Sequence, residues 1–129
     1  MSARPPVEGS GFGRLRESFG HAFRGVGILL RTQTNARLHL AASVVVIGAG
    51  FGFGISRMEW LALVIAIGLV FSAEGLNTAI EALVDLASPE RHPLAGRAKD
   101  LAAGAVLIAA LAAAVVGVLV FGPRFLALL

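Results

Sequence analysis

The sequence contains no cysteine, little charge and no pattern typical of β-strands. The lack of cysteine excludes a disulfide framework and a thiolate metal site within the chain. Only 15% of the 129 residues are charged and 57% are hydrophobic, which is more apolar than a soluble globular protein. No internal repeat is visible. We therefore expect an all-α integral membrane protein with a single domain.

Several sequence signals of known function are also missing. The first hydrophobic run begins near Leu38, after a long polar region, which is not the layout of a cleaved secretory signal. The chain has neither a Walker sequence nor the loop set of protein kinases. The glycine-rich segment at residues 48–54 does not follow a strand, so close helix approach or a helix end explains it better than a nucleotide loop. The chain therefore lacks the familiar sequence motifs that bind nucleotide phosphates.

The hydropathy pattern predicts three membrane spans, at about residues 38–55, 59–86 and 98–121. Residues 1–13 are rich in Pro, Gly and Ser and predict a flexible tail, so that residues 14–129 form the membrane domain. A helix at about residues 14–34 is expected to be amphipathic and to lie on the cytoplasmic leaflet, or to pack against the spans. Its apolar residues recur at helical spacing with arginines between them: Phe12, Leu15, Phe19, Phe23, Val26 and Leu30.

The basic residues are distributed unevenly along the chain. Six arginines precede the first span and three basic residues lie between the second and third, whereas only Arg57 and Arg124 fall on the other side. This positive-inside bias predicts that the N-terminus and the second loop face the cytoplasm, as in a multi-pass protein of the cell inner (cytoplasmic) membrane. A nucleic-acid surface is the competing interpretation, but the bias already accounts for the basic residues, so we expect no nucleic-acid partner.

Four polar residues recur in the second half of the second span, where a carboxylate costs roughly 2.5–3.5 kcal/mol. On an α-helix they share an arc of roughly 80° and a length of about 16 Å, reaching from within the bilayer to its cytoplasmic boundary. These residues are Glu74, Asn77, Glu81 and Asp85. The sequence therefore predicts a polar track that leads to a carboxylate at lipid depth.

Such a track can serve phosphoryl transfer. Its carboxylates can hold a hard cation such as Mg²⁺, a deeper carboxylate can act as a general base, and Lys99 can contact a phosphate. The acceptor would be an alcohol delivered from the membrane. Two other interpretations remain open from the residues alone. Intramembrane acids also serve as ion or proton relays in transporters, and they can be partners at an oligomer interface.

The same stretch closely resembles the prokaryotic diacylglycerol kinase and undecaprenol kinase family of small membrane enzymes. The resemblance is carried by EGLNTAIEALVD, HPLAGRAKD and AAGAVL, and more weakly upstream by FRGVGILLRTQTNARLHL, so it covers roughly residues 18–122. It implies a homotrimer of three-span protomers, each with an N-terminal surface helix, whose active sites lie between subunits. It also implies ATP as phosphoryl donor, Mg²⁺ as cofactor and a lipid alcohol as acceptor.

The resemblance assigns roles in the membrane part of the site. Glu74 matches the catalytic base that takes the proton from the lipid hydroxyl, and Asn77 matches the asparagine that organises that site. Glu81 matches a Mg²⁺ ligand. Many relatives carry a glutamate as second ligand before the first span, where this chain has Gln33. A glutamine carbonyl can coordinate a hard cation but brings no charge, so we expect weaker metal binding there.

The resemblance also assigns a nucleotide region. Lys99 and Asp100 match the pair that engages the nucleotide, His92 and Gly96 match the loop around the adenosine, and Asp85 matches an acid near the nucleotide. The expected function is thus ATP- and Mg²⁺-dependent phosphorylation of a membrane lipid alcohol. The residues of these motifs resemble those of undecaprenol kinases more than those of diacylglycerol kinases. Undecaprenol is therefore the first expectation for the acceptor, diacylglycerol the alternative, and an ion or proton transporter the non-enzyme alternative.

Overall fold

A computed structural model describes residues 9–129 of the chain and contains no strand in that range. Three of its helices are long and apolar enough to cross a membrane. The all-α class and the three spans are therefore confirmed, and the chain is a multi-pass membrane protein. Most of the predicted tail, residues 1–8, lies outside the described residues. The helices are α1 (Gly11–Thr32), α2 (Thr34–Phe53), α3 (Arg57–Ala87) and α4 (Pro93–Ala127).

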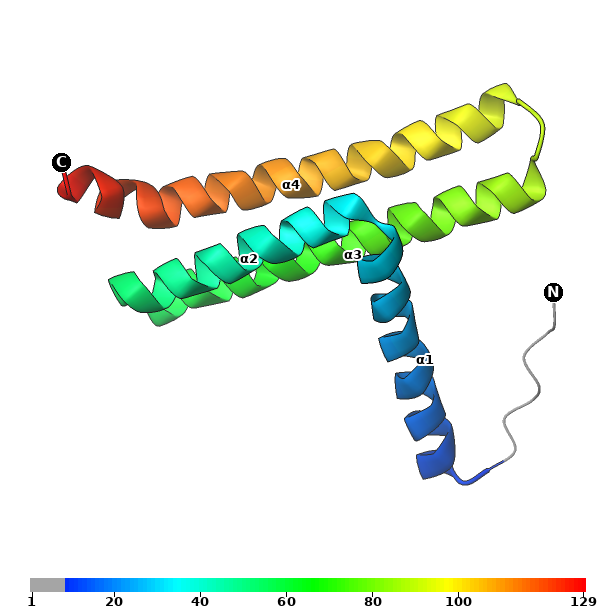
Figure 1. Ribbon diagram of the computed structural model, residues 1–129, viewed down its shortest axis with the longest axis horizontal. Helices are drawn as coiled ribbons and strands as arrows, with labels where there is room; N and C mark the ends of the chain where they lie inside the picture. Colours follow the sequence, from blue (N-terminus) through cyan, green and yellow to red (C-terminus); the bar gives the residue numbers. More distant parts are fainter. Residues whose placement is uncertain (1–8) are drawn as a thin grey trace.

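The helices α3 and α4 run antiparallel side by side, with α2 along one part of α3, whereas α1 leaves this bundle at a steep angle (Figure 1). At 1.5 Å per residue, α3 is about 46 Å long and α2 only about 30 Å. The part of α3 near the α3–α4 loop therefore extends beyond the start of α2. We call this part of the bundle, with residues 88–92, the loop end, and the opposite part the C-terminal end.

The first helices differ from their predicted bounds for local reasons. The helix α1 begins at Gly11, inside the predicted tail, because the Ser10 hydroxyl accepts a hydrogen bond from the Gly13 N–H at 3.3 Å. Only Gln33 separates α1 from α2, since its extended backbone (φ −109°, ψ 114°) breaks the helical path for one residue. The first membrane helix therefore begins at Thr34, four residues before its predicted span.

The last helix also begins earlier and ends later than its predicted span of 98–121. It begins at Pro93, where a proline has no unsatisfied N–H, and the His92 ring nitrogen Nδ1 accepts from the Leu94 N–H at 3.1 Å. At its other end the helix continues through Pro123 to Ala127. The Arg124 guanidinium donates to the Val120 carbonyl at 2.6 Å in this last part of the helix.

The C-terminal end of the bundle holds a small apolar core built on Ile55, Leu63, Val120 and Phe121. The turn before it requires glycine at one position, because Gly54 closes α2 with a left-handed backbone (φ 64°). Arg124 of α4 adds two charge-assisted hydrogen bonds to the Glu59 carboxylate of α3, at 2.7 and 2.9 Å. The start of α3 is thus joined to the end of α4 on the side of the molecule away from the predicted site.

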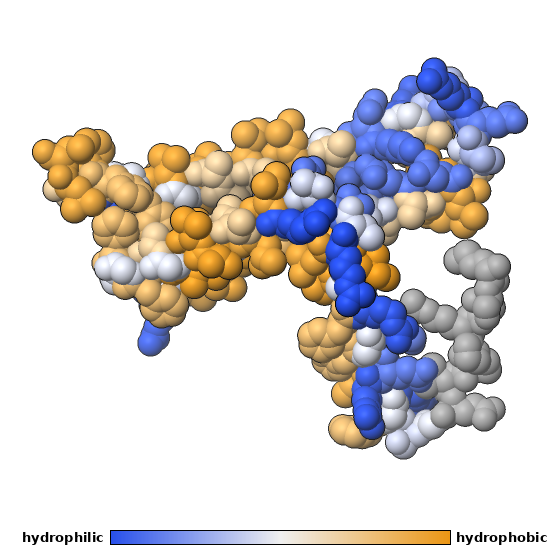
Figure 2. Space-filling view, viewed as in Figure 1, coloured by the Kyte–Doolittle hydropathy of each residue, from blue (hydrophilic) through white to orange (hydrophobic). Residues whose placement is uncertain are grey.

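Apolar and polar surfaces separate along the molecule, as Figure 2 shows. Hydrophobic residues cover most of the bundle, whereas hydrophilic ones gather at the loop end and along α1. Large apolar side chains of α4 remain exposed, among them Leu107, Ile108 and Val118 at 59%, 71% and 68%. Such a surface suits lipid or other helices rather than water.

Candidate functional site

The predicted polar track follows one uninterrupted helix, because α3 runs unbroken to Ala87. Burial decreases along it toward the loop end. Glu74 is 2% exposed and is the only buried charged residue in the part of the chain that the structure describes. Glu81 is half-buried, and the Asp85 side chain is 67% exposed. The track therefore has the graded burial that its sequence pattern predicts.

Glu74 contacts a histidine of the neighbouring helix. The distance between His39 Nε2 of α2 and Glu74 Oε1 is 3.2 Å. This separation is within hydrogen-bond reach, but the alignment is not that of a hydrogen bond, so Oε1 has no hydrogen-bond partner among residues 9–129. One turn later, the Thr78 hydroxyl donates to the Glu74 backbone carbonyl at 2.9 Å. The Glu74 carboxylate is thus buried with its polar atoms incompletely satisfied.

Asn77 and Glu81 contact each other on successive turns of α3. Asn77 Nδ2 donates to Glu81 Oε1 at 3.3 Å, while Asn77 Oδ1 is buried without a partner among residues 9–129. A buried acceptor with no donor is costly, so this oxygen is available to a donor other than the described residues. In the described residues, no three His, Asp or Glu side chains gather around one point. One half-buried carboxylate still fits Mg²⁺, which often takes one or two carboxylates plus water and phosphate oxygens.

Gln33, the doubtful metal ligand, lies at the junction of α1 and α2. Its side-chain amide donates to the neighbouring Thr32 hydroxyl at 3.4 Å. No contact joins it to Glu81 among the described residues. Its role as a ligand stays a prediction.

At the loop end, Asp85 and Lys99 form an ion pair across the loop. The distance between Lys99 Nζ and Asp85 Oδ1 is 2.6 Å. Both residues line a cavity of about 510 Å³, together with His92 and Gly96. Four of the five residues predicted for the nucleotide therefore surround one cavity, and the fifth, Asp100, is exposed outside it. Because His92 Nδ1 accepts the Leu94 N–H, the ring hydrogen of the neutral imidazole is at Nε2, which has no hydrogen-bond partner among residues 9–129.

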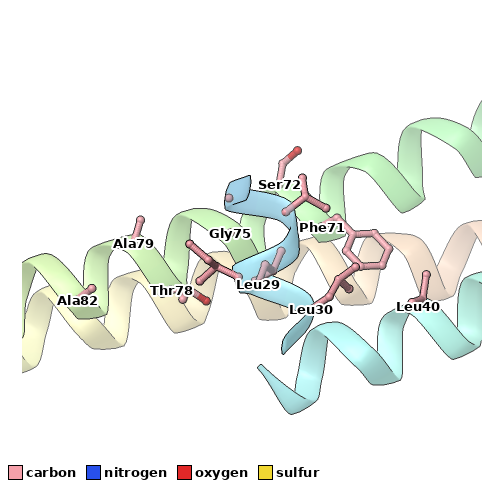
Figure 3. A pocket seen from close by; sticks show the side chains of 12 residues that line it. Leu29, Leu30, Leu40, Phe71, Ser72, Gly75, Thr78, Ala79 and Ala82 are labelled. Atoms are coloured by element: carbon pink, nitrogen blue, oxygen red, sulfur yellow. The ribbon is translucent and has the colours of Figure 1, made fainter. Parts of the chain in front are cut away.

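A larger, apolar cavity of about 730 Å³ lies where α1, α2 and α3 meet (Figure 3). Leu29 and Leu30 of α1, Leu40 of α2 and Phe71 of α3 contribute to its wall. Gly75, directly after Glu74, also lines it. Thus the buried carboxylate belongs to the same turn of α3 as the wall of an apolar cavity.

The sequence did not identify these cavity residues, since ordinary leucines and alanines carry no chemical signal. It also gave His39 no role. A signal was nevertheless present, because His39 and Ser43 are the clearly polar residues of the first predicted span. A polar group within a span is expensive and often functional.

Comparison with known proteins finds similar sequences in one family. The family model described as prokaryotic diacylglycerol kinase matches residues 20–121. An undecaprenol kinase of Bacillus subtilis is 45% identical over 111 residues, covering 86% of this chain and 90% of the relative. A diacylglycerol kinase of Synechocystis is 42% identical over 116 residues, covering 89% and 66%. A diacylglycerol kinase of Escherichia coli K12 is 29% identical over 116 residues, covering 90% and 95%.

The family match spans both the polar track and the loop-end cavity, and the relatives are named as kinases of lipids. The chain therefore belongs to the prokaryotic diacylglycerol kinase family and is a lipid kinase.

Proposed function

We propose that this chain phosphorylates undecaprenol to undecaprenyl phosphate, with ATP as donor and Mg²⁺ as cofactor. The observation that carries the proposal is the place of Glu74, a buried carboxylate next to the wall of a large apolar cavity and on the same helix as the loop-end cavity. A lipid chain in the first cavity and a nucleotide in the second would approach the polar track from its two ends.

In this reaction the chain's own residues hold and move a proton. The Glu74 carboxylate accepts the proton of the lipid hydroxyl, and the hydroxyl oxygen forms a bond to the γ-phosphorus as the bond to ADP breaks. Lys99 binds the phosphates as a point charge at the loop end. Glu81 would hold Mg²⁺ in part, and the bound ion would supply neutralisation of the phosphate charge. Asn77 keeps the Glu81 carboxylate in place through its amide.

The composition of the apolar cavity favours a polyprenyl alcohol over diacylglycerol. Its twelve lining residues include only two with polar side chains, Ser72 and Thr78. The Thr78 hydroxyl already donates to the Glu74 carbonyl. Diacylglycerol carries two ester groups close to its hydroxyl, and burying them without donors would be unfavourable, whereas a polyprenyl chain needs none. The relatives named as diacylglycerol kinases make that lipid the second candidate.

We further propose a homotrimer in the cell inner (cytoplasmic) membrane, with α1 on the cytoplasmic surface and the loop end facing the cytoplasm. The buried Asn77 oxygen, which has no donor among residues 9–129, and the exposed apolar side chains of α4 support a site completed by a neighbouring subunit. The excess of basic residues before α2 and in the α3–α4 loop supports the orientation.

The decisive experiment is a phosphate-transfer assay on the purified chain with ATP and Mg²⁺. Undecaprenol and diacylglycerol are compared at equal mole fractions in the same detergent. We expect a higher kcat/KM for undecaprenol. Glu74→Gln should lower turnover at least about 10²-fold, because a general base contributes roughly 10²–10⁴-fold. Glu17→Gln, an exposed acid on α1, is the matched control and should retain activity.

Each proposal has its own contrary outcome. A preference for diacylglycerol would reverse the choice of acceptor but leave the kinase in place. Near-normal turnover by Glu74→Gln would remove Glu74 as the base. No transfer to either lipid, together with ion or proton flux in liposomes, would favour the transporter interpretation.

A further inference from the structure

The Glu74 carboxylate has an electrostatic requirement that its own helix does not meet. The carboxylate is 2% exposed and its Oε1 lacks a hydrogen bond, and a buried polar atom without a partner is costly. A base at this position therefore needs a donor that holds one of its oxygens.

The structure supplies one candidate for that donor. His39 Nε2 lies 3.2 Å from Glu74 Oε1, and His39 is the one basic side chain that contacts Glu74 in the described part of the chain. It comes from α2, six residues into that helix, at the level where α2 meets the middle of α3. Its hydrogen-bond geometry is imperfect, but catalytic hydrogen bonds are often poorly aligned without substrate and become shorter when it binds.

We propose that His39 is a positioning residue that donates its Nε2–H to Glu74 Oε1 and so holds the base in a fixed orientation. The other carboxylate oxygen is then left to accept the proton of the lipid alcohol. The neutral imidazole is sufficient, since one tautomer carries the hydrogen at Nε2. His39 transfers no proton in this scheme and touches no substrate atom. The proposal rests on the proposed function, because it concerns the base of that reaction.

The position of His39 supports action through Glu74 rather than packing alone. Its side chain is 30% exposed, so most of the imidazole is buried, and its Nε2 lies against the Glu74 carboxylate, whose side chain is only 3% exposed. The neighbouring Leu40 lines the apolar cavity, which places this turn of α2 beside the expected lipid chain. The contact therefore links the base, the second helix and the lipid cavity at one level of the bundle.

The test compares His39→Ala, His39→Gln and His39→Asn in the phosphate-transfer assay, with kcat and KM measured separately for lipid and ATP. The amide nitrogen of Gln can occupy nearly the position of Nε2, whereas the Asn side chain is too short to place its amide nitrogen there. We expect His39→Ala and His39→Asn to lower kcat on the order of 100-fold, the size of a misplaced catalytic group, with little change in KM for ATP. His39→Gln should recover most of the activity.

The control is His21→Ala, which removes an imidazole from α1 where its hydrogen-bond partner is Arg24, and it should retain activity. Because Gln and Asn are both polar amides, their comparison stays informative even where His39→Ala does not fold. A kcat of His39→Ala within about twofold of wild type, or a Gln variant no better than Asn, would overturn the positioning role. No transfer by the wild-type protein would overturn the proposed function itself and this inference with it.

Discussion

Lys99 Nζ lies 2.6 Å from Asp85 Oδ1, so the end of α3 and the start of α4 are joined by an ion pair at the mouth of the loop-end cavity. The pair includes Lys99, the only lysine of the chain. Lys99 and Asp85 are 14 residues apart in the sequence, so the sequence alone did not predict their contact. A lysine held in this way is oriented before a phosphate arrives, while its exposure leaves it free to exchange the carboxylate for that phosphate.

The first prediction concerns this pair. Lys99→Met should raise the KM for ATP and lower kcat at least about tenfold, because a phosphate contact of 1.4 kcal/mol or more is lost. Asp85→Asn should have a smaller effect, since it leaves the ammonium in place. Steady-state kinetics with ATP as the varied substrate tests both. Arg97→Met, which removes a nearby exposed charge outside the cavity, is the matched control, and an equal loss in that variant would indicate a general charge effect.

The second prediction concerns the metal. Glu81→Gln should raise the Mg²⁺ concentration needed for half-maximal activity, because it removes a charged oxygen ligand. Gln33→Glu should lower that concentration, since it adds a charged oxygen at the position expected to supply the second ligand. Activity is measured over a Mg²⁺ titration at saturating ATP. Gln33→Ala serves as the neutral control. If Gln33→Glu leaves the titration unchanged, the residue lies outside the metal site.

The third prediction concerns the apolar cavity. Ala79→Phe places a ring in the cavity between α1 and α3, so it should raise the KM for the lipid while leaving the KM for ATP almost unchanged. Ala103→Phe adds the same ring to an exposed position of α4 and is the control. Kinetics with the lipid varied at fixed detergent measures the difference. Equal behaviour of the two variants would mean that the cavity does not take the lipid chain.

The fourth prediction separates stability from catalysis at the other end of the bundle. Arg124→Met should lower the melting temperature in detergent, because it removes two hydrogen bonds to Glu59 and one to the Val120 carbonyl. At a temperature where the variant is folded, kcat should stay near that of the wild type. The double variant Glu59→Arg with Arg124→Glu exchanges the two charges and should recover part of the loss in melting temperature. A large loss of kcat in the folded variant would contradict the separation.

The fifth prediction concerns orientation, and the absence of native cysteine makes it simple to test. Single cysteines are introduced at two exposed positions, Met58→Cys at the C-terminal end and Glu90→Cys in the loop. In intact cells a membrane-impermeant maleimide should label Met58→Cys and spare Glu90→Cys, because the basic segments favour the cytoplasmic side. Labelling of both after lysis is the control. The reverse pattern in intact cells would overturn the orientation.

Much of the fold could be read from the sequence because membrane insertion depends on local composition. A run of apolar residues must form a helix in lipid, where its backbone groups have no other partners, so three spans followed directly from hydropathy. The ends of helices depended on single hydrogen bonds instead. The capping hydrogen bonds of Ser10 and His92 set the first residues of α1 and α4. Several nearby residues of similar type could also form such caps, so the sequence does not predict which residue begins the helix.

The candidate site also has one part that the sequence predicted and another part that it did not. Spacing along one helix placed Glu74, Asn77, Glu81 and Asp85 in a single track, since the helical period alone decides which residues share a face. The helical period does not predict contacts between residues of different helices. The pairing of Lys99 with Asp85, the contact of His39 with Glu74 and the apolar cavity all depend on how α1, α2 and α4 pack against α3.

The sequence by itself determined a membrane lipid kinase with a polar track in its second span, because composition, periodicity and specific motifs are properties of neighbouring residues. Only the tertiary structure decided which group faces the buried Glu74 and where the two cavities lie along the bundle. The physical reason is that the cost of a buried charge is met by residues distant in the chain, and packing alone brings those residues within hydrogen-bond reach.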